Sequence, residues 1–209
     1  MTGKTAFICL VAAIALLAVP SARGQTQESI AVFFTGNELG SMKPCGCSGG
    51  QLGGLDRRYA VFNTINTQNR LIIDTGSLVP ESTEQNLIKF NIIVQAFAQL
   101  GYDVVNLNEQ DILIARQAGL LDGLGSLFNG ITAGSPDDVK LPAKFTKKFK
   151  LNGIVFEAVV AAAETEDQTS RLSELFSSSA ESPSTLKILI LNRADAKIIA
   201  TVSQMHIFD

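Results

Sequence analysis

The chain has 209 residues, of which 17 are basic and 20 acidic, so its net charge is −3. This length is enough for one compact domain. The slightly acidic balance argues against nucleic acid and anionic lipid as partners, because both are bound through clustered positive charge.

The first 24 residues have the pattern of a cleaved secretory signal. Lys4 is the only charge before an apolar run at 6–19, and the small residues Ala22 and Gly24 precede a cut before Gln25. The run is shorter than the roughly 20 residues that cross a bilayer, so a retained membrane anchor is the weaker alternative. We therefore predict a secreted chain, periplasmic or extracellular, that consists of a single domain at 25–209 with a net charge of −5.

Strands and helices are predicted to alternate through the first half of this domain. Strands are expected at 29–34, 70–74 and 103–107, and helices at 52–65, 84–100 and 111–121. The second helix carries apolar residues on one face and stops at Gly101, a residue typical of helix ends. Strands that alternate with amphipathic helices form a mostly parallel sheet that is covered by helices on both faces.

The second half is predicted to contain a hairpin. Runs at 145–151 and 154–161 flank Asn152-Gly153, the strongest short hairpin signal. A short strand is expected at 130–133, a polar helical segment at 165–179 and a strand at 186–191, whereas 196–202 has no clear preference. Lysines cluster from Lys140 to Lys150, and we expect them to be solvated.

Three loops are predicted to lie at one rim of the sheet, because parallel sheets bind ligands at the carboxyl ends of their strands. They are residues 36–54, 76–79 and 108–111. Chemistry is therefore expected in these loops rather than at His206, the only histidine, which we interpret as structural.

The first rim loop contains Cys45 and Cys47, one residue apart. Their spacing fits neither C-x-x-C-H for haem nor the C-x-x-C of thioredoxin-like sites, and two thiolates do not complete a zinc site. The first interpretation is a strained local disulfide. The alternatives are free thiols or pairing with a partner, and a metal or redox role.

The same loop continues into a helix through the sequence GGLDRR. Glycine-rich loops that lead into a helix expose backbone N–H groups to an anion, and arginine adds a bidentate phosphate contact. We therefore predict substrate contacts at Gly53, Gly54, Arg57 and Arg58. The equally weighted alternative is that the glycines only allow a tight loop and close packing.

The ordered segments FFTGNELG, PCGC, QLGGLDRR, LIIDTGSLV and LGYDVVNLNEQDI resemble the amino-terminal half of the periplasmic metallophosphoesterases of the 5'-nucleotidase type, which include a thiosulfohydrolase branch. The likeness is to a subgroup with Pro-Cys-Gly-Cys, and it covers residues 30–114 well. It implies an α/β fold, a layered metallophosphoesterase-like sheet with helices on both faces, whose carboxy-terminal part is truncated here.

The resemblance also implies a pair of divalent metals that activate water and polarise a phosphoryl oxygen. Their ligands are replaced at successive positions of this chain. Asn37 and Leu39 occupy the Asp-x-His place, Ser77 the place of the bridging aspartate, and Glu109 and Gln110 the Asn-His place. Asp74 is retained.

Oxygen atoms at the rim offer an alternative site for a hard cation such as Ca²⁺ or Mg²⁺. The candidates are Asn37, Glu38, Asn108 and Glu109. The competing interpretation is that the acidic residues are helix caps, and Asp111 is expected to open the third helix in that role. If the resemblance holds, Asn37, Ser77 and Glu109 converge at one rim.

Three functions remain open from the sequence. The preferred one is a secreted, non-catalytic binding or scaffolding module, with an anionic small molecule or a periplasmic protein as its partner. The second is a metal-dependent phosphoric or sulfur ester hydrolase with an atypical metal site. The third is a thiol or disulfide role for Cys45 and Cys47.

Overall fold

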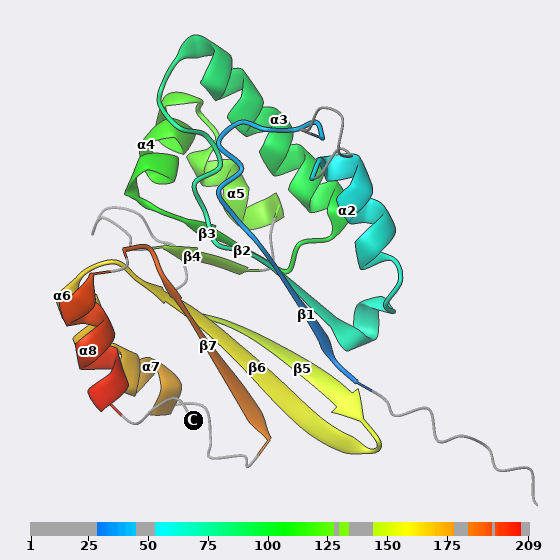
Figure 1. Ribbon diagram of the computed structural model, residues 1–209, viewed down its shortest axis with the longest axis vertical. Helices are drawn as coiled ribbons and strands as arrows, with labels where there is room; N and C mark the ends of the chain where they lie inside the picture. The colour runs from blue at the N-terminus through cyan, green and yellow to red at the C-terminus, as the bar shows by residue number, and fades with distance from the viewer. Residues whose placement is uncertain are drawn as a thin grey trace, which may run out of the picture.

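A computed structural model describes residues 29–44, 53–127, 130–133, 144–177, 184–193 and 195–205 (Figure 1). The proposed signal, both cysteines of the first rim loop and His206 lie outside these residues. The sequence-based expectations for them therefore stay predictions.

The first half of the chain forms a parallel sheet with four strands in the order β1-β2-β3-β4. The strands are β1 (Ala31–Thr35), β2 (Arg70–Asp74), β3 (Val104–Leu107) and β4 (Gly130–Ala133). Between them run α2 (Leu55–Phe62), the short 3-10 helix η1 (Thr67–Asn69), α3 (Glu84–Leu100), α4 (Glu109–Gln117) and α5 (Leu121–Leu127). This is the alternation that the sequence pattern predicted.

The second half forms a three-stranded sheet in the order β5-β6-β7. The strands β5 (Lys144–Leu151) and β6 (Ile154–Ala163) make the predicted antiparallel hairpin, and β7 (Thr185–Leu191) lies parallel to β6. Asn152 and Gly153 turn the chain with φ values of 51° and 82°, as a tight two-residue hairpin requires. The remaining helices are α6 (Glu166–Ser170), α7 (Leu172–Ser177) and α8 (Ala196–Gln204).

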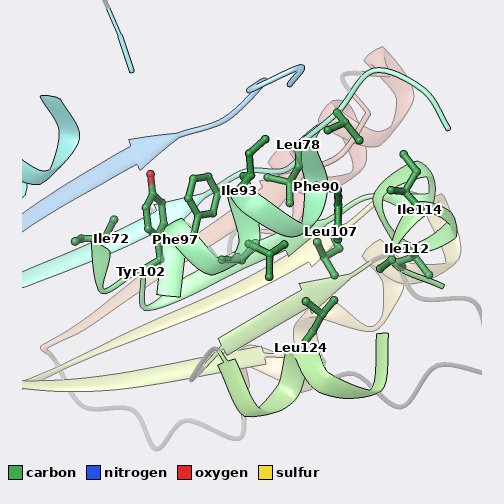
Figure 2. Close-up of a cluster of buried hydrophobic side chains, with 14 of the residues drawn as sticks. Ile72, Leu78, Phe90, Ile93, Phe97, Tyr102, Leu107, Ile112, Ile114 and Leu124 are labelled. Atoms are coloured by element: carbon green, nitrogen blue, oxygen red, sulfur yellow. The ribbon is translucent and has the colours of Figure 1, made fainter. Parts of the chain in front are cut away.

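The two sheets pack face to face between two layers of helices (Figure 1). Alternate residues of β2 point to opposite sides, as strand geometry dictates. Ile72 belongs to the apolar cluster on the helix side, where it lies near Phe97 of α3 (Figure 2), whereas Leu71 and Ile73 belong to the cluster that contains Phe149 and Ile190 of the second sheet. The expected layered α/β fold is confirmed. It contains two sheets that pack against each other, and helices cover the outer face of each sheet.

The core between the first sheet and its helices is the largest of three apolar clusters among the described residues (Figure 2). Phe90, Ile93 and Phe97 on one face of α3 meet Ile72 of β2 and Leu107 of β3. Gly101 ends α3 with φ 75°, as predicted, and its N–H donates to the carbonyl of Ala98. Tyr102, which follows Gly101, stacks on Phe97 with ring centroids 4.1 Å apart.

The structure corrects the start of α4. Asn108 is the N-cap and α4 begins at Glu109, so Asp111 is the third helical residue and does not open the helix. The side chains of Asn108 and Asp111 satisfy each other's backbone N–H groups in a capping box. The undetermined segment at 196–202 lies within α8.

The lysine cluster is also only partly solvated. Lys147 points into the sandwich, where its Nζ donates to Asp103 Oδ1 at 2.7 Å and to the backbone carbonyl of Arg70 at 2.8 Å. Lys148 and Lys150 are exposed, as expected. Lys147 therefore ties the hairpin to the first sheet.

Candidate functional site

The loops after β1 and β2 bond to each other at the carboxyl ends of the strands. The N–H groups of Asn37, Leu39 and Gly40 donate to the carbonyls of Gly76, Ser77 and Leu78, at 2.9, 3.1 and 2.8 Å. These bonds fix residues 37–40 and 76–78 as one surface. We call this surface, together with Asn108 at the start of α4, the rim.

Backbone strain is concentrated at the rim. Among the described residues, four that are not glycine have a positive φ, and Asn37, Leu39 and Ser77 are three of them, at 55°, 47° and 63°. This left-handed conformation costs an ordinary residue roughly 1–2 kcal/mol. Leu39 also keeps 52% of its surface exposed.

Beneath the rim, Asp74 at the end of β2 is completely buried. Its Oδ2 accepts the Thr35 hydroxyl at 2.6 Å, and its Oδ1 accepts the Gly76 N–H at 2.9 Å. Burial raises the pKa of Asp74 to about 7, because these two bonds only partly offset the loss of water. Asp74 thus holds both β1 and the second rim loop.

A chain of polar contacts leads from Asp74 through Arg58 of α2 to Glu38 in the first rim loop. The Thr35 hydroxyl lies 3.0 Å from the Tyr102 hydroxyl, and Arg58 Nη1 donates to that hydroxyl at 2.9 Å. Because the Thr35 proton is directed to Asp74, Tyr102 is the donor in the middle bond. Arg58 Nη2 completes the chain with an ion pair to Glu38, which is 4% exposed.

The ion pair does not fully compensate the burial of Glu38. Its pKa is raised, first by loss of water and against the lowering effect of Arg58. The guanidinium of Arg58 also lies 5.9 Å from the centre of the Phe97 ring. Arg58 is thus enclosed by Glu38, Tyr102 and Phe97.

Asp111, also completely buried, holds the second rim loop from the other side. Its carboxylate accepts the N–H groups of Ser77 at 2.8 Å, Leu78 at 2.9 Å and Asn108 at 3.3 Å. Burial raises the pKa of Asp111 to about 6 despite these three donors. Its lone pairs are therefore directed at the protein backbone.

Ser77 itself is engaged with the third rim loop, since its Oγ accepts the Asn108 side-chain amide at 3.0 Å. Gly76 beside it has φ 96°, and a Cβ there would approach the Asn106 carbonyl to 3.1 Å and Asp111 Oδ2 to 3.2 Å. Only glycine fits this position without displacing its neighbours. Asn106 in turn donates to Asn192, after β7, at 2.5 Å, which links the rim to the second sheet.

The structure brings together some of the predicted site residues. Asn37, Ser77 and Asn108 meet at the rim with Asp74 directly below. Glu109 lies beside them on the first turn of α4 with an exposed side chain. Thr35, Tyr102 and Asn106 were not predicted, and isolated polar residues at strand ends carry no sequence signal of their contacts.

The four residues that were predicted to contact an anion differ in how open their surroundings are. Gly54 precedes α2 with φ 90°, and a Cβ there would come within 2.7 Å of Pro44, so close packing explains this glycine. A Cβ at Gly53 would meet open space. Arg57 is exposed, whereas both terminal nitrogens of Arg58 are engaged with Glu38 and Tyr102. Arg57 is therefore the arginine that is open to an anion.

The rim does not suit a pair of divalent metals. Within the described residues, no three His, Cys, Asp or Glu side chains are grouped so that they could hold a metal ion. The buried carboxylates of Asp74 and Asp111 accept bonds from the backbone and from Thr35. The oxygen-ligand alternative does not fit either, because Glu38 is paired with Arg58 and Asn108 with Ser77 and Asp111.

Two solved structures share this arrangement of layers. The 5'-nucleotidase precursor of Thermus thermophilus superposes with a TM-score of 0.57 at 14% identity, over 77% of this chain and 36% of its own. The chain has a 5'-nucleotidase-like fold. The NAD nucleotidase of Haemophilus influenzae also superposes with a TM-score of 0.57, at 9% identity, over 81% of this chain and 35% of its own.

The chain thus spans about a third of the length of each of these nucleotidases. No protein-family model matches its sequence, and no curated protein does. Among the helices that the structure describes, none is long and apolar enough to cross a membrane.

Proposed function

We propose that this chain is a secreted, non-catalytic binding or scaffolding module built on the 5'-nucleotidase-like fold. The observation that carries the proposal is the use of the rim carboxylates. Asp111 accepts three backbone N–H groups and Asp74 accepts Gly76 and Thr35, so the groups that would bind metal hold the loops instead.

Free energy favours this role over metal binding. A cation at Asp111 would have to displace the donors of Ser77 and Leu78, and each buried N–H left without an acceptor costs about 1–3 kcal/mol. Leu39 and Ser77, at the imidazole and bridging-carboxylate positions, have no charge with which to offset that cost.

The rim has the character of a binding surface for a protein. Strained backbone is retained at sites where function requires it, and the rim holds Asn37, Leu39 and Ser77 in left-handed conformations. The exposed Leu39 side chain supplies an apolar contact, and Asn37 beside it supplies an amide. An anionic small molecule that binds near Arg57 is the second candidate ligand.

Metal binding and hydrolysis test the proposal directly. The purified chain is analysed for bound metal and titrated calorimetrically with Mn²⁺, Zn²⁺, Mg²⁺ and Ca²⁺, and hydrolysis of p-nitrophenyl phosphate and of nucleotides is measured with each. We expect no stoichiometric metal and no turnover. Stoichiometric binding with activity that is lost in Asp74→Asn would establish the alternative, a metal-dependent phosphoric or sulfur ester hydrolase.

Ligand binding at the rim is measured separately. Backbone NMR shifts are followed while inorganic phosphate or adenosine monophosphate is added. Shifts confined to 53–58 that disappear in Arg57→Ala would identify an anion ligand, and unchanged spectra would favour the protein partner. The thiol hypothesis for Cys45 and Cys47 is addressed by labelling before and after reductant, since two labels without reductant would exclude the local disulfide.

The secretion part of the proposal has its own test. The chain is expressed in a bacterium, and the amino terminus of the exported form is sequenced. We expect it to begin at Gln25. A chain that retains residues 1–24 in the membrane fraction would show that this segment is an anchor.

A further inference from the structure

The solvent-facing side of α3 is unusual for a surface helix. Only two of its 17 residues, Glu84 and Lys89, are charged. Its outward positions are occupied by glutamine and isoleucine: Gln85, Ile88, Ile92, Gln95 and Gln99 are exposed. Ile88 and Ile92 keep 58% and 46% of their surfaces exposed.

A hollow lies beside the carboxyl-terminal half of the same helix. It has a volume of about 320 Å³ and is lined by residues of α2 and α3. Its lining is mostly apolar: Leu55, Asp56 and Tyr59 from α2, and Ala96, Gln99 and Leu100 from α3. Tyr59 at its border is 60% exposed. We call the exposed side of α3 together with this hollow the α2–α3 face.

Contiguous exposed apolar patches mark interaction sites. The distribution within the α2–α3 face suggests which partner it fits. The protruding isoleucines are at one end of the exposed stripe and the hollow is at the other. A face with a protrusion and a hollow on one straight helix is complementary to itself when the second copy runs antiparallel.

We propose that the α2–α3 face is the interface of a symmetric homodimer in which Ile88 of each copy enters the α2–α3 hollow of the other. A two-fold axis near residue 94 places position 88 opposite position 100, and position 92 opposite Ala96. Ile92 then packs on a small side chain, which allows the two helices to approach closely. Two-fold dimers are the commonest protein oligomers, and their contacts are reciprocal in this way.

The few charges of the face agree with this register. Asp56 is the acidic residue of the hollow, and Lys89 is the basic residue next to Ile88. The two-fold arrangement brings Lys89 of one copy towards Asp56 of the other, twice per dimer. Uncharged glutamines fill the stripe between these pairs, so the two copies do not repel each other.

The dimer is tested with the full chain by sedimentation velocity over a concentration series. We expect a monomer–dimer equilibrium in which Ile88→Glu raises the dissociation constant by about 30-fold or more, the size of effect typical for a central interface residue. The matched control is Leu113→Glu, a similar change at a residue that is 44% exposed on α4. It should leave the dissociation constant unchanged.

A second variant tests the register itself. Lys89→Glu places a like charge opposite Asp56 of the other copy and should weaken the dimer, and we expect Asp56→Lys added to the same chain to recover most of the lost affinity. Thermal unfolding of each variant checks that the fold is intact. A chain that is monomeric at every concentration, or a dimer that Ile88→Glu leaves unchanged, would overturn the proposal. Loss without recovery in the double variant would overturn the two-fold register.

Discussion

The backbone N–H of Ser77 donates to Asp111 Oδ2 at 2.8 Å. Ser77 stands where the resemblance places a metal-bridging aspartate, and Asp111 is the third residue of α4. A helix cap and the substituted position are therefore parts of one hydrogen-bonded unit. This unit closes the second rim loop without a cation, and its strength can be measured.

Asp111→Asn should lower the free energy of unfolding by about 3 kcal/mol. The amide can accept through one atom only, so at least one of the Ser77 and Leu78 N–H groups loses its buried acceptor. Urea denaturation measures the change. Glu109→Gln is the matched control on the same turn of α4, and it should cost only a few tenths of a kcal/mol because Glu109 is exposed. Equal losses in the two variants would contradict a special role for Asp111.

Asp74 should make the protein less stable as the pH rises. Burial raises its pKa in the folded state to about 7 from an ordinary value of 3.8, so the folded chain binds more protons than the unfolded chain between these values. The stability that the protonated carboxyl contributes is complete below pH 4 and is lost as the pH rises through about 7. Asp111, whose pKa is also raised, acts in the same direction.

The comparison with Asp74→Asn isolates this effect. Asparagine has the charge of the protonated acid at every pH, so the difference in unfolding free energy between variant and parent should shift in favour of the variant from pH 4.5 to pH 8. The slope is expected to be on the order of 1 kcal/mol per pH unit. A difference that does not change with pH would show that Asp74 titrates normally.

Arg58→Ala should destabilise the fold by about 3 kcal/mol. It leaves the carboxylate of Glu38 buried without its ion partner and removes the donor to Tyr102. Replacing both members, Glu38→Gln with Arg58→Ala, should cost less than the single arginine change. Chemical denaturation of the full double-mutant cycle gives the coupling energy, and additive losses would show that the ion pair contributes nothing.

Leu39→Gly should stabilise the protein by up to about 1 kcal/mol. Leu39 has φ 47°, where glycine is unstrained, and its exposed side chain loses little packing when it is removed. The same change at Leu113, inside α4, should cost about 1 kcal/mol. Thermal denaturation of both variants distinguishes the signs. A destabilised Leu39→Gly would mean that this side chain packs on the rim more tightly than its exposure indicates.

The sequence pattern predicted the elements because their signals are local. Leu71 and Ile73 alternate with Ile72 on a buried strand, Gly101 ends α3, and Asn152-Gly153 turns the hairpin. Each depends on a few adjacent residues. The resemblance added the order of the rim loops, and the solved nucleotidases support the fold that it implied.

Other features could not be predicted because they join residues far apart in the chain. Nothing near Lys147 indicates that it meets Asp103 between the sheets, and nothing near Arg58 indicates Glu38 and Tyr102 as its partners. The role of Asp111 was only half anticipated. Its place at a helix start is a local property, whereas its hold on Ser77 exists only in the folded chain.

The sequence by itself determined the alternating elements and the acidic charge, and through the resemblance it led us to expect replaced metal ligands at Leu39 and Ser77. Only the tertiary structure decided what became of the remaining carboxylates. Packing two sheets between helices removes water from Asp74 and Asp111, and a buried carboxylate must then find donors within the protein. The donors that they find are the Thr35 hydroxyl and the backbone N–H groups of Gly76, Ser77, Leu78 and Asn108, and the rim is therefore closed by hydrogen bonds.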